Sequence, residues 1–160
     1  PRSTLFPYTT LFRSRDNKEA QEQSFLFTNI CPQRHNLNTG AWNDVELQCR
    51  AWAKRYGDLY IVCGPVLYDQ QHKTIGRNRV VVPEAFFKVV LRKQDNDYKA
   101  IGFLYENKGA SRDMSRYVRS VDEIEELTGL DFFSLLPDQD EERIEKQANL
   151  RDWYPLREIK

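Results

Sequence analysis

A series of short, strand-like segments joined by tight turns most constrains the fold of this chain. Apolar, β-prone stretches occupy residues 58–67, 80–82, 86–91 and 98–105. Pro83 separates two of them, and residues 94–97 have the composition of a hairpin turn between the last two. Hairpin turns join antiparallel strands. The sequence therefore predicts a mostly antiparallel sheet, and the continuous apolar run at 58–67 predicts a strand that is buried on both faces.

Helical periodicity appears on both sides of this series. After Gly40, apolar residues recur every three or four positions and predict an amphipathic helix that ends at Gly57. Further helices are expected at 121–127, before Gly129, and at 139–150. A strand is expected at 24–30, followed by Pro32 and a polar loop at 34–38. The predicted class is α+β, with a mostly antiparallel sheet flanked by helices.

The first fourteen residues differ in character from the rest. The chain begins with Pro1, and residues 1–14 (PRSTLFPYTTLFRS) resemble the translation of a sequencing-adapter oligonucleotide. We expect this segment to be non-native and residues 15–160 to form one partial domain. The alternative is a native edge strand at 4–12, because its Leu, Phe, Tyr and Thr residues favour strands.

The charge distribution permits contact with nucleic acid without requiring it. Residues 1–120 hold 19 Lys+Arg and 12 Asp+Glu, whereas residues 121–160 hold 5 and 12. A basic body fits a surface that meets phosphates, and it fits ordinary solvated charge equally well. No apolar stretch is long enough to cross a bilayer. Candidates for contacts to a phosphate backbone are Arg34, Lys54, Arg77 and Arg79.

The three cysteines match no zinc-binding spacing. We expect Cys31, Cys49 and Cys63 to be small buried apolar side chains, and one disulfide between two of them is left open.

Residues 28–46 concentrate side-chain amides between two apolar elements. An amide oxygen is a neutral ligand, so a hydrated Mg²⁺ held by one amide keeps its charge available to a phosphate. Asn38 and Glu46 would lie about 12 Å apart along a helix axis at roughly 1.5 Å per residue. The candidate site residues of this window are Asn29, Gln33, Asn36, Asn38 and Glu46.

This separation suggests distinct roles. Asn38, at the helix entrance, would bind the metal, and Glu46 would hold a water next to it. Asn29 and Gln33 would orient the loop. In the structural alternatives, Asn38 only caps the helix, Asn29 satisfies backbone groups, and Glu46 lies on a solvated face.

The same window resembles the signature of the DNA/RNA non-specific endonuclease family, the ββα-metal nucleases. The pattern Asn-Ile-x-Pro-Gln falls at 29–33, Leu-Asn-x-Gly-x-Trp at 37–42, and the following glutamate is Glu46. Segments 50–53, 62–66, 120–125 and 128–133 are also similar, so the resemblance spans roughly 24–154. It implies a ββα-metal nuclease core, DNA and RNA as substrates, Mg²⁺ with Mn²⁺ as a substitute, and an extracytoplasmic location. By this resemblance Asn38 is the metal ligand, Glu46 positions water, and Asn29 and Gln33 support them.

One departure from the family pattern affects the predicted activity. The family's general base is a histidine in an Asp-Arg-Gly-His motif upstream of this window, and the 160 residues contain no such motif. Together with the adapter-like start, this absence predicts an N-terminally truncated, incomplete core with little or no cleavage. His35 and His72 are expected to be loop residues rather than replacement bases.

Two further functional hypotheses remain open. The chain could be a non-catalytic nucleic-acid-binding module that retains the nuclease fold, or a fragment that does not fold alone because a sheet edge is exposed. A homodimer and a protein inhibitor are also left open as partners.

Overall fold

A four-stranded antiparallel sheet forms the centre of the computed structural model, which describes residues 31–68, 71–94 and 97–154. The strand order is β1 (Leu59–Val66), β4 (Ala85–Gln94), β5 (Asp97–Glu106) and β6 (Val118–Arg119). β4 and β5 pair along their whole length, with Gln94 opposite Asp97, which confirms the predicted hairpin. The predictions for residues 1–14, for the strand at 24–30 and for Asn29 fall outside the described residues.

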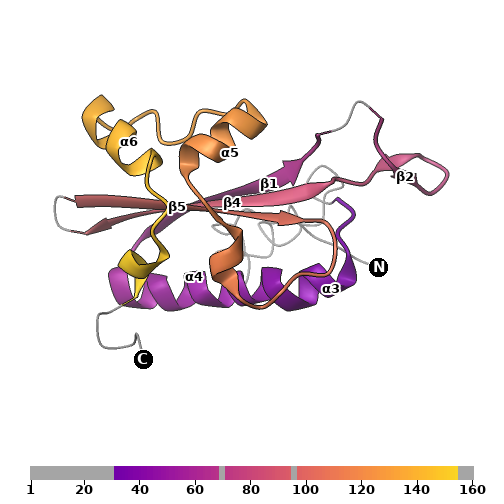
Figure 1. Ribbon diagram of the computed structural model, residues 1–160, viewed down its shortest axis with the longest axis horizontal. Helices are drawn as coiled ribbons and strands as arrows, with labels where there is room; N and C mark the ends of the chain where they lie inside the picture. Colours follow the sequence, from indigo (N-terminus) through magenta and orange to yellow (C-terminus); the bar gives the residue numbers. More distant parts are fainter. Residues whose placement is uncertain (1–30, 69–70, 95–96, 155–160) are drawn as a thin grey trace, which may run out of the picture.

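Helices cover both faces of this sheet, so the described part has three layers (Figure 1). Helix α4 (Asn43–Tyr56) lies on one face, and α5 (Val121–Thr128) and α6 (Asp138–Glu145) lie on the other. Side chains of β4 alternate between two cores: Phe86 and Val90 pack on the α4 side, and Phe87 and Val89 pack on the α5 and α6 side. The predicted α+β class is confirmed.

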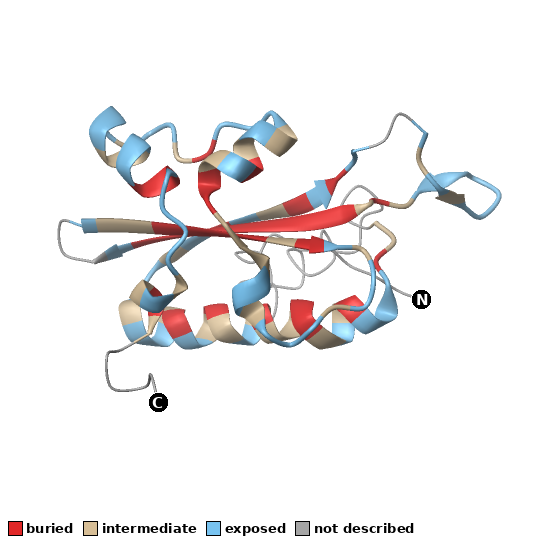
Figure 2. Ribbon diagram, in the orientation of Figure 1, coloured by how far each residue is buried: buried red, intermediate tan, exposed pale blue. Residues whose placement is uncertain are grey.

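The prediction that the strand at 58–67 is buried on both faces is wrong. Burial alternates along β1: Ile61 and Val66 are buried, whereas Tyr60 and Val62 are exposed. Within the described residues β1 stands at the edge of the sheet, and the central strand β4 is the one that is buried along most of its length (Figure 2). A continuous apolar run therefore did not identify the central strand.

Helix α5 begins and ends as its sequence predicts. The Ser120 hydroxyl accepts a hydrogen bond from the Glu123 backbone N–H, and the Glu123 carboxylate accepts one from the Ser120 N–H. Gly129 follows in the left-handed conformation, with φ of 68°. The helix packs closely on β5, because a Cβ at Gly102 would lie 2.5 Å from the Ile124 side chain.

The last predicted helix is shorter than expected. α6 ends at Glu145 instead of reaching Leu150, and the 3₁₀ helix η4 (Leu150–Trp153) follows on the opposite side of the sheet. The change of direction lets Trp153 pack with Trp52 of α4, their ring centroids 4.7 Å apart. The chain therefore turns towards this aromatic contact instead of continuing the helix for the five further residues that were predicted. In the described part of the chain, no helix has the length and apolar character needed to span a membrane.

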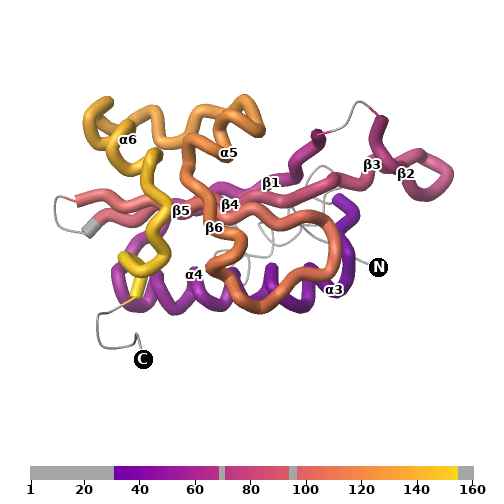
Figure 3. Tube along the Cα trace, viewed as in Figure 1, coloured from indigo at the N-terminus to yellow at the C-terminus, as the bar shows by residue number. Residues whose placement is uncertain are grey.

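A small hairpin projects from the body of the molecule, formed by β2 (Thr74–Ile75) and β3 (Val80–Val81) (Figures 1 and 3). The strand predicted at 80–82 therefore pairs with an unpredicted partner in a separate two-stranded sheet. β6 was likewise not predicted, because two residues are too few to show a periodic pattern.

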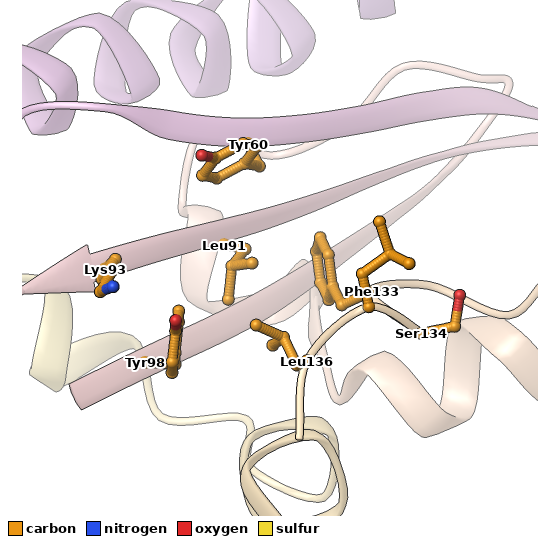
Figure 4. Close-up of a pocket in the computed structure, with 8 residues that line it drawn as sticks. Tyr60, Leu91, Lys93, Tyr98, Phe133, Ser134 and Leu136 are labelled. Carbon is orange, nitrogen blue, oxygen red and sulfur yellow. The ribbon is translucent and has the colours of Figure 1, made fainter. Parts of the chain in front are cut away.

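A hollow of about 470 Å³ opens on the face that carries α5 and α6 (Figure 4). Since Asn38 precedes α4 on the other face, this hollow is separate from the predicted metal site. Its lining residues are Tyr60, Leu91, Lys93, Tyr98 and Phe133 to Leu136.

All three cysteines have free thiols. Cys49 is buried, and burial raises its pKa to about 12. Burial, with a smaller effect from Cys63, also raises the pKa of Cys31 to about 12. The prediction of buried cysteines is thus confirmed for Cys49 only, because Cys31 and Cys63 are half-buried, and the disulfide that was left open is not formed.

Candidate functional site

Asn38 lies in a kinked helical entrance to α4, where the sequence predicted a polar loop. A single α-turn, α3 (His35–Leu37), leads into the π-helical turn η2 (Asn38–Trp42), and α4 follows directly. Gly40 leaves helical geometry, with φ of −103° and ψ of −115°, and produces the kink. Leu37 and Trp42 are buried in the core on the α4 side, so the turn is anchored while Asn38 remains half-buried.

The Asn38 side chain is oriented by Gln33. Its Nδ2 donates a hydrogen bond to Gln33 Oε1 at 2.7 Å. Gln33 is only 5% exposed, so the acceptor is held by the surrounding packing. Because Asn38 uses its nitrogen in this bond, its Oδ1 is the atom that can serve as a neutral metal ligand. Gln33 Nε2 is buried and has no hydrogen-bond partner among the described residues.

Glu46 lies in the first turn of α4, eight residues after Asn38, and is half-buried. Its charge raises the pKa of the Cys49 thiol, whereas the charge of Lys88 lowers it, both as smaller effects than burial. Glu46 and Lys88 therefore lie near the same thiol. Asn36, the remaining amide of this window, is exposed in α3.

Lys88 is a site residue that the sequence analysis did not select. It lies in the centre of β4, is fully buried, and places its Nζ 4.5 Å from the ring centroid of Trp42. A buried ammonium is costly unless nearby groups offset its desolvation, and an aromatic face does so in part. The available signal was a lysine within the apolar run Phe86 to Leu91.

Asn107, which was also missed, joins the segment before Asn38 to the end of the sheet. Its Nδ2 donates to the carbonyls of Pro32 at 3.1 Å and Pro83 at 2.8 Å. Its Oδ1 accepts a hydrogen bond from the Arg34 N–H at 2.7 Å. The bonds to Pro32 and Arg34 lie on either side of Gln33, and the bond to Pro83 ties this segment to the start of β4, so Asn107 holds the backbone that carries the acceptor for Asn38. A single asparagine just after a strand gives no sequence signal for this role.

Replacing Asn107 with alanine is expected to lower the free energy of unfolding by about 2–4 kcal/mol, because three backbone groups lose their partner at once. Urea unfolding monitored by tryptophan fluorescence measures the change. Asn78→Ala, in the exposed turn between β2 and β3, is the matched control and should change stability by less than about 0.5 kcal/mol. A loss below about 1 kcal/mol for Asn107→Ala would show that water replaces these bonds without cost.

The two histidines occupy different surroundings. His35 is exposed in α3. His72 Nδ1 lies 3.1 Å from Glu84 Oε1, and this hydrogen bond is the main reason that the pKa of Glu84 is lowered. Of the four basic residues considered for phosphate contacts, all are exposed, and Arg77 and Arg79 lie in the turn of the projecting hairpin.

Several known proteins resemble the chain in sequence. The mitochondrial nuclease EXOG of Danio rerio is 30% identical over 140 residues, which are 79% of this chain and 41% of that protein. EXOG of Xenopus laevis is 33% identical over 138 residues, or 76% and 38% of the two chains. The Serratia marcescens nuclease is 35% identical over 118 residues, or 69% and 44%. The chain thus spans less than half the length of these relatives.

A solved structure and a family model agree with this likeness. The structure described as the EndoG/EndoGI complex superposes with a TM-score of 0.75 at 24% identity, covering 88% of this chain and 61% of that one. At this identity the likeness establishes the fold alone, which is that of the ββα-metal nucleases. The model of the DNA/RNA non-specific endonucleases matches residues 5–139. Since this match covers most of the sequence, the chain belongs to the DNA/RNA non-specific endonuclease family.

Proposed function

We propose that this chain carries the metal-binding part of an endonuclease that hydrolyses phosphodiester bonds in DNA and RNA without sequence preference. The observation that carries the proposal is the Asn38 amide, half-buried at the kinked entrance to α4 and oriented by Gln33 at 2.7 Å. The hydrogen bond to Gln33 keeps the Asn38 amide from rotating and so fixes the position of its neutral oxygen. Mg²⁺ is the proposed ion, with Mn²⁺ as a substitute.

The residues of the site suit a hydrated ion that keeps its charge. When bound, such an ion would act as a Lewis acid and stabilise negative charge on the phosphate and on the leaving oxygen. Asn38 Oδ1 would hold it, and the buried Gln33 would keep the Asn38 amide from rotating. Glu46 would orient a nearby water as a hydrogen-bond acceptor, and Asn29 would support the loop as the family resemblance implies.

The projecting β2–β3 hairpin is a second element that suits nucleic acid. Arg77 and Arg79 are exposed in its turn, and the hairpin extends from the end of the sheet near which α3 lies (Figures 1 and 3). Basic side chains on such an arm would contact phosphates, which carry no sequence information. Binding should therefore depend strongly on salt and little on sequence.

The metal site is tested by local paramagnetic broadening. In an ¹⁵N-labelled chain, a small amount of Mn²⁺ should broaden the backbone amide signals of Thr39 and Gly40, and excess Mg²⁺ should restore them. Asn38→Ala should abolish this broadening, because the only proposed protein ligand is removed. Gln33→Ala should weaken Mn²⁺ binding by about 10- to 100-fold, the usual effect of removing a group that orients a ligand.

Asn36→Ala is the matched control, since it removes an exposed amide two residues from the proposed ligand. It should leave the broadening unchanged. If the Thr39 and Gly40 signals broaden equally in Asn38→Ala, Mn²⁺ is bound by other groups and the proposal is wrong. The readout reports the metal site without requiring catalysis.

The exposed Arg77 and Arg79 would serve equally well in a second candidate, a nucleic-acid-binding module with the same fold and no activity of its own. Tight, salt-dependent binding of DNA together with no cleavage by the complete gene product would support it. An extracytoplasmic location is proposed from the family resemblance alone. The EXOG relatives are named as mitochondrial, and the solved relative is a complex with an inhibitor. Both properties belong to those proteins and are not assigned to this chain.

A further inference from the structure

Three carboxylates of α5 and α6 lie close together. These two helices cover the face of the sheet opposite α4 (Figure 1). Asp122 and Glu125 come from α5, and Glu145 comes from the last turn of α6. One oxygen of each lies within 4.8 Å of the others. These residues belong to the acidic segment 121–160, whose charge the nuclease site does not use.

Glu145 is the unusual member of this cluster, because it is only 7% exposed. Its Oε1 is buried and accepts no hydrogen bond from any described residue. Glu141, one turn earlier on α6, also has a buried Oε1 without a partner in the described part of the chain. A buried carboxylate oxygen without a donor is costly, so these oxygens indicate a missing positive partner.

The charges around Glu145 increase this cost. Burial, as the largest cause, and then the neighbouring carboxylates raise the pKa of Glu145 to about 8; these carboxylates are Glu125, Glu141, Asp122 and Asp131. The basic residues of α6 are engaged elsewhere: Arg143 pairs with Asp97 and Asp140, and Lys146 pairs with Glu142. Glu145 also ends its helix, where the negative end of the helix dipole disfavours an anion.

We propose that Asp122, Glu125 and Glu145 form a divalent-cation site of the calcium-binding type that joins α5 to α6. Ca²⁺ binds carboxylate oxygens at about 2.3–2.6 Å, so two of its ligands lie up to about 5 Å apart, whereas the limit for Mg²⁺ is near 4.2 Å. Separations within 4.8 Å are compatible with Ca²⁺. Glu125 Oε1 is fixed by the Phe132 N–H at 2.6 Å, which leaves its other oxygen for the cation.

The site differs from the proposed nuclease centre in place and in chemistry. Asn38 offers one neutral oxygen on the α4 side, whereas this cluster offers three anionic oxygens between two short helices of the other layer. α6 is only eight residues long, and although α5 and α6 both pack on β5, they contact each other directly at few positions. A cation at this position would stabilise the outer layer of the fold and need not take part in catalysis.

Thermal unfolding of the chelator-treated 160-residue chain at pH 8 tests the proposal. Ca²⁺ at 100 times its dissociation constant should raise Tm by roughly 5–10 °C. Glu145→Gln keeps the shape of the side chain and removes its charge, so it should weaken Ca²⁺ binding at least about tenfold by calorimetry. Without Ca²⁺ this variant should unfold at the same temperature as the parent chain or higher, because it relieves charge repulsion. Asp122→Asn provides a second variant at a more exposed position.

Two comparisons separate the site from other cation effects. Glu126→Gln, an exposed carboxylate on α5, should leave the Ca²⁺ response unchanged. Asn38→Ala should also leave it unchanged, because that residue belongs to the other centre. The proposal is overturned if Ca²⁺ does not raise Tm of the parent chain, or if it raises Tm of Glu145→Gln and Asp122→Asn by the same amount. A larger rise with Mg²⁺ than with Ca²⁺ would overturn the assignment to calcium.

Discussion

The 160-residue chain is expected to cleave DNA and RNA at least about 100-fold, and up to about 10,000-fold, more slowly than a family member that carries the Asp-Arg-Gly-His motif. This range is the contribution of a well-placed general base. In the proposed site Asn38 would hold the metal ion, Gln33 would orient Asn38 and Glu46 would orient a water, but none of these roles removes a proton from the attacking water. Nicking of supercoiled plasmid and degradation of a labelled RNA, each with Mg²⁺ or Mn²⁺, measure the rate.

The 160-residue chain should still bind DNA although it cleaves DNA slowly. A filter-binding assay at increasing salt should still detect DNA, because contacts to phosphate do not depend on the general base. His35→Ala should leave the residual cleavage unchanged, since His35 is an exposed residue of α3. Cleavage at the rate of a motif-bearing family member, lost on His35→Ala, would contradict the prediction and identify His35 as the base.

Replacing Trp52 with alanine is expected to lower the free energy of unfolding by about 3–5 kcal/mol, the largest effect on stability that we predict. Trp52 is 1% exposed at the centre of the core on the α4 side. Its ring lies 4.7 Å from that of Trp153 and 6.3 Å from that of Phe103, measured between centroids. Removing it leaves a cavity among aromatic rings that cannot close without moving η4.

Two further variants distinguish ring packing from other contributions. Trp52→Phe should cost about 1–2 kcal/mol, because it keeps one aromatic ring and removes a buried Nε1 that has no partner among the described residues. Leu47→Ala, on the exposed side of the same helix, is the matched control and should change stability by less than about 0.5 kcal/mol. Urea unfolding measures all three, and equal losses for Trp52→Ala and Leu47→Ala would contradict the proposed core.

Helices and turns that are marked by residues close together in the sequence were predicted well. The helix predicted at 121–127 before Gly129 is α5, which runs to Thr128, and Gln94 pairs with Asp97 where the hairpin between β4 and β5 was predicted. Helix α4 ends before Gly57 as expected. Its entrance was predicted poorly, because the kink at Gly40 allows helical turns to continue through a segment whose polar composition favours a loop.

The candidate site was predictable in part for the same reason. Gln33 and Asn38 are five residues apart, so local backbone geometry brings them into contact. Lys88 and Asn107 reach the site from the strands, and nothing near them in sequence indicates this. The acidic cluster also joins residues from two helices, so the charge count showed only that the segment is acidic.

The sequence by itself determined the α+β class, most strands and helices, and the concentration of amides before α4, because these depend on periodicity, turn residues and short spacings. Only the tertiary structure decided that β4 and β5 occupy the centre of the sheet, that Trp153 closes the core against α4, and that Glu145 is buried beside Asp122 and Glu125. The physical reason is that strand order, long-range packing and the meeting of distant charges depend on how the layers pack together. No local pattern in the chain encodes that packing.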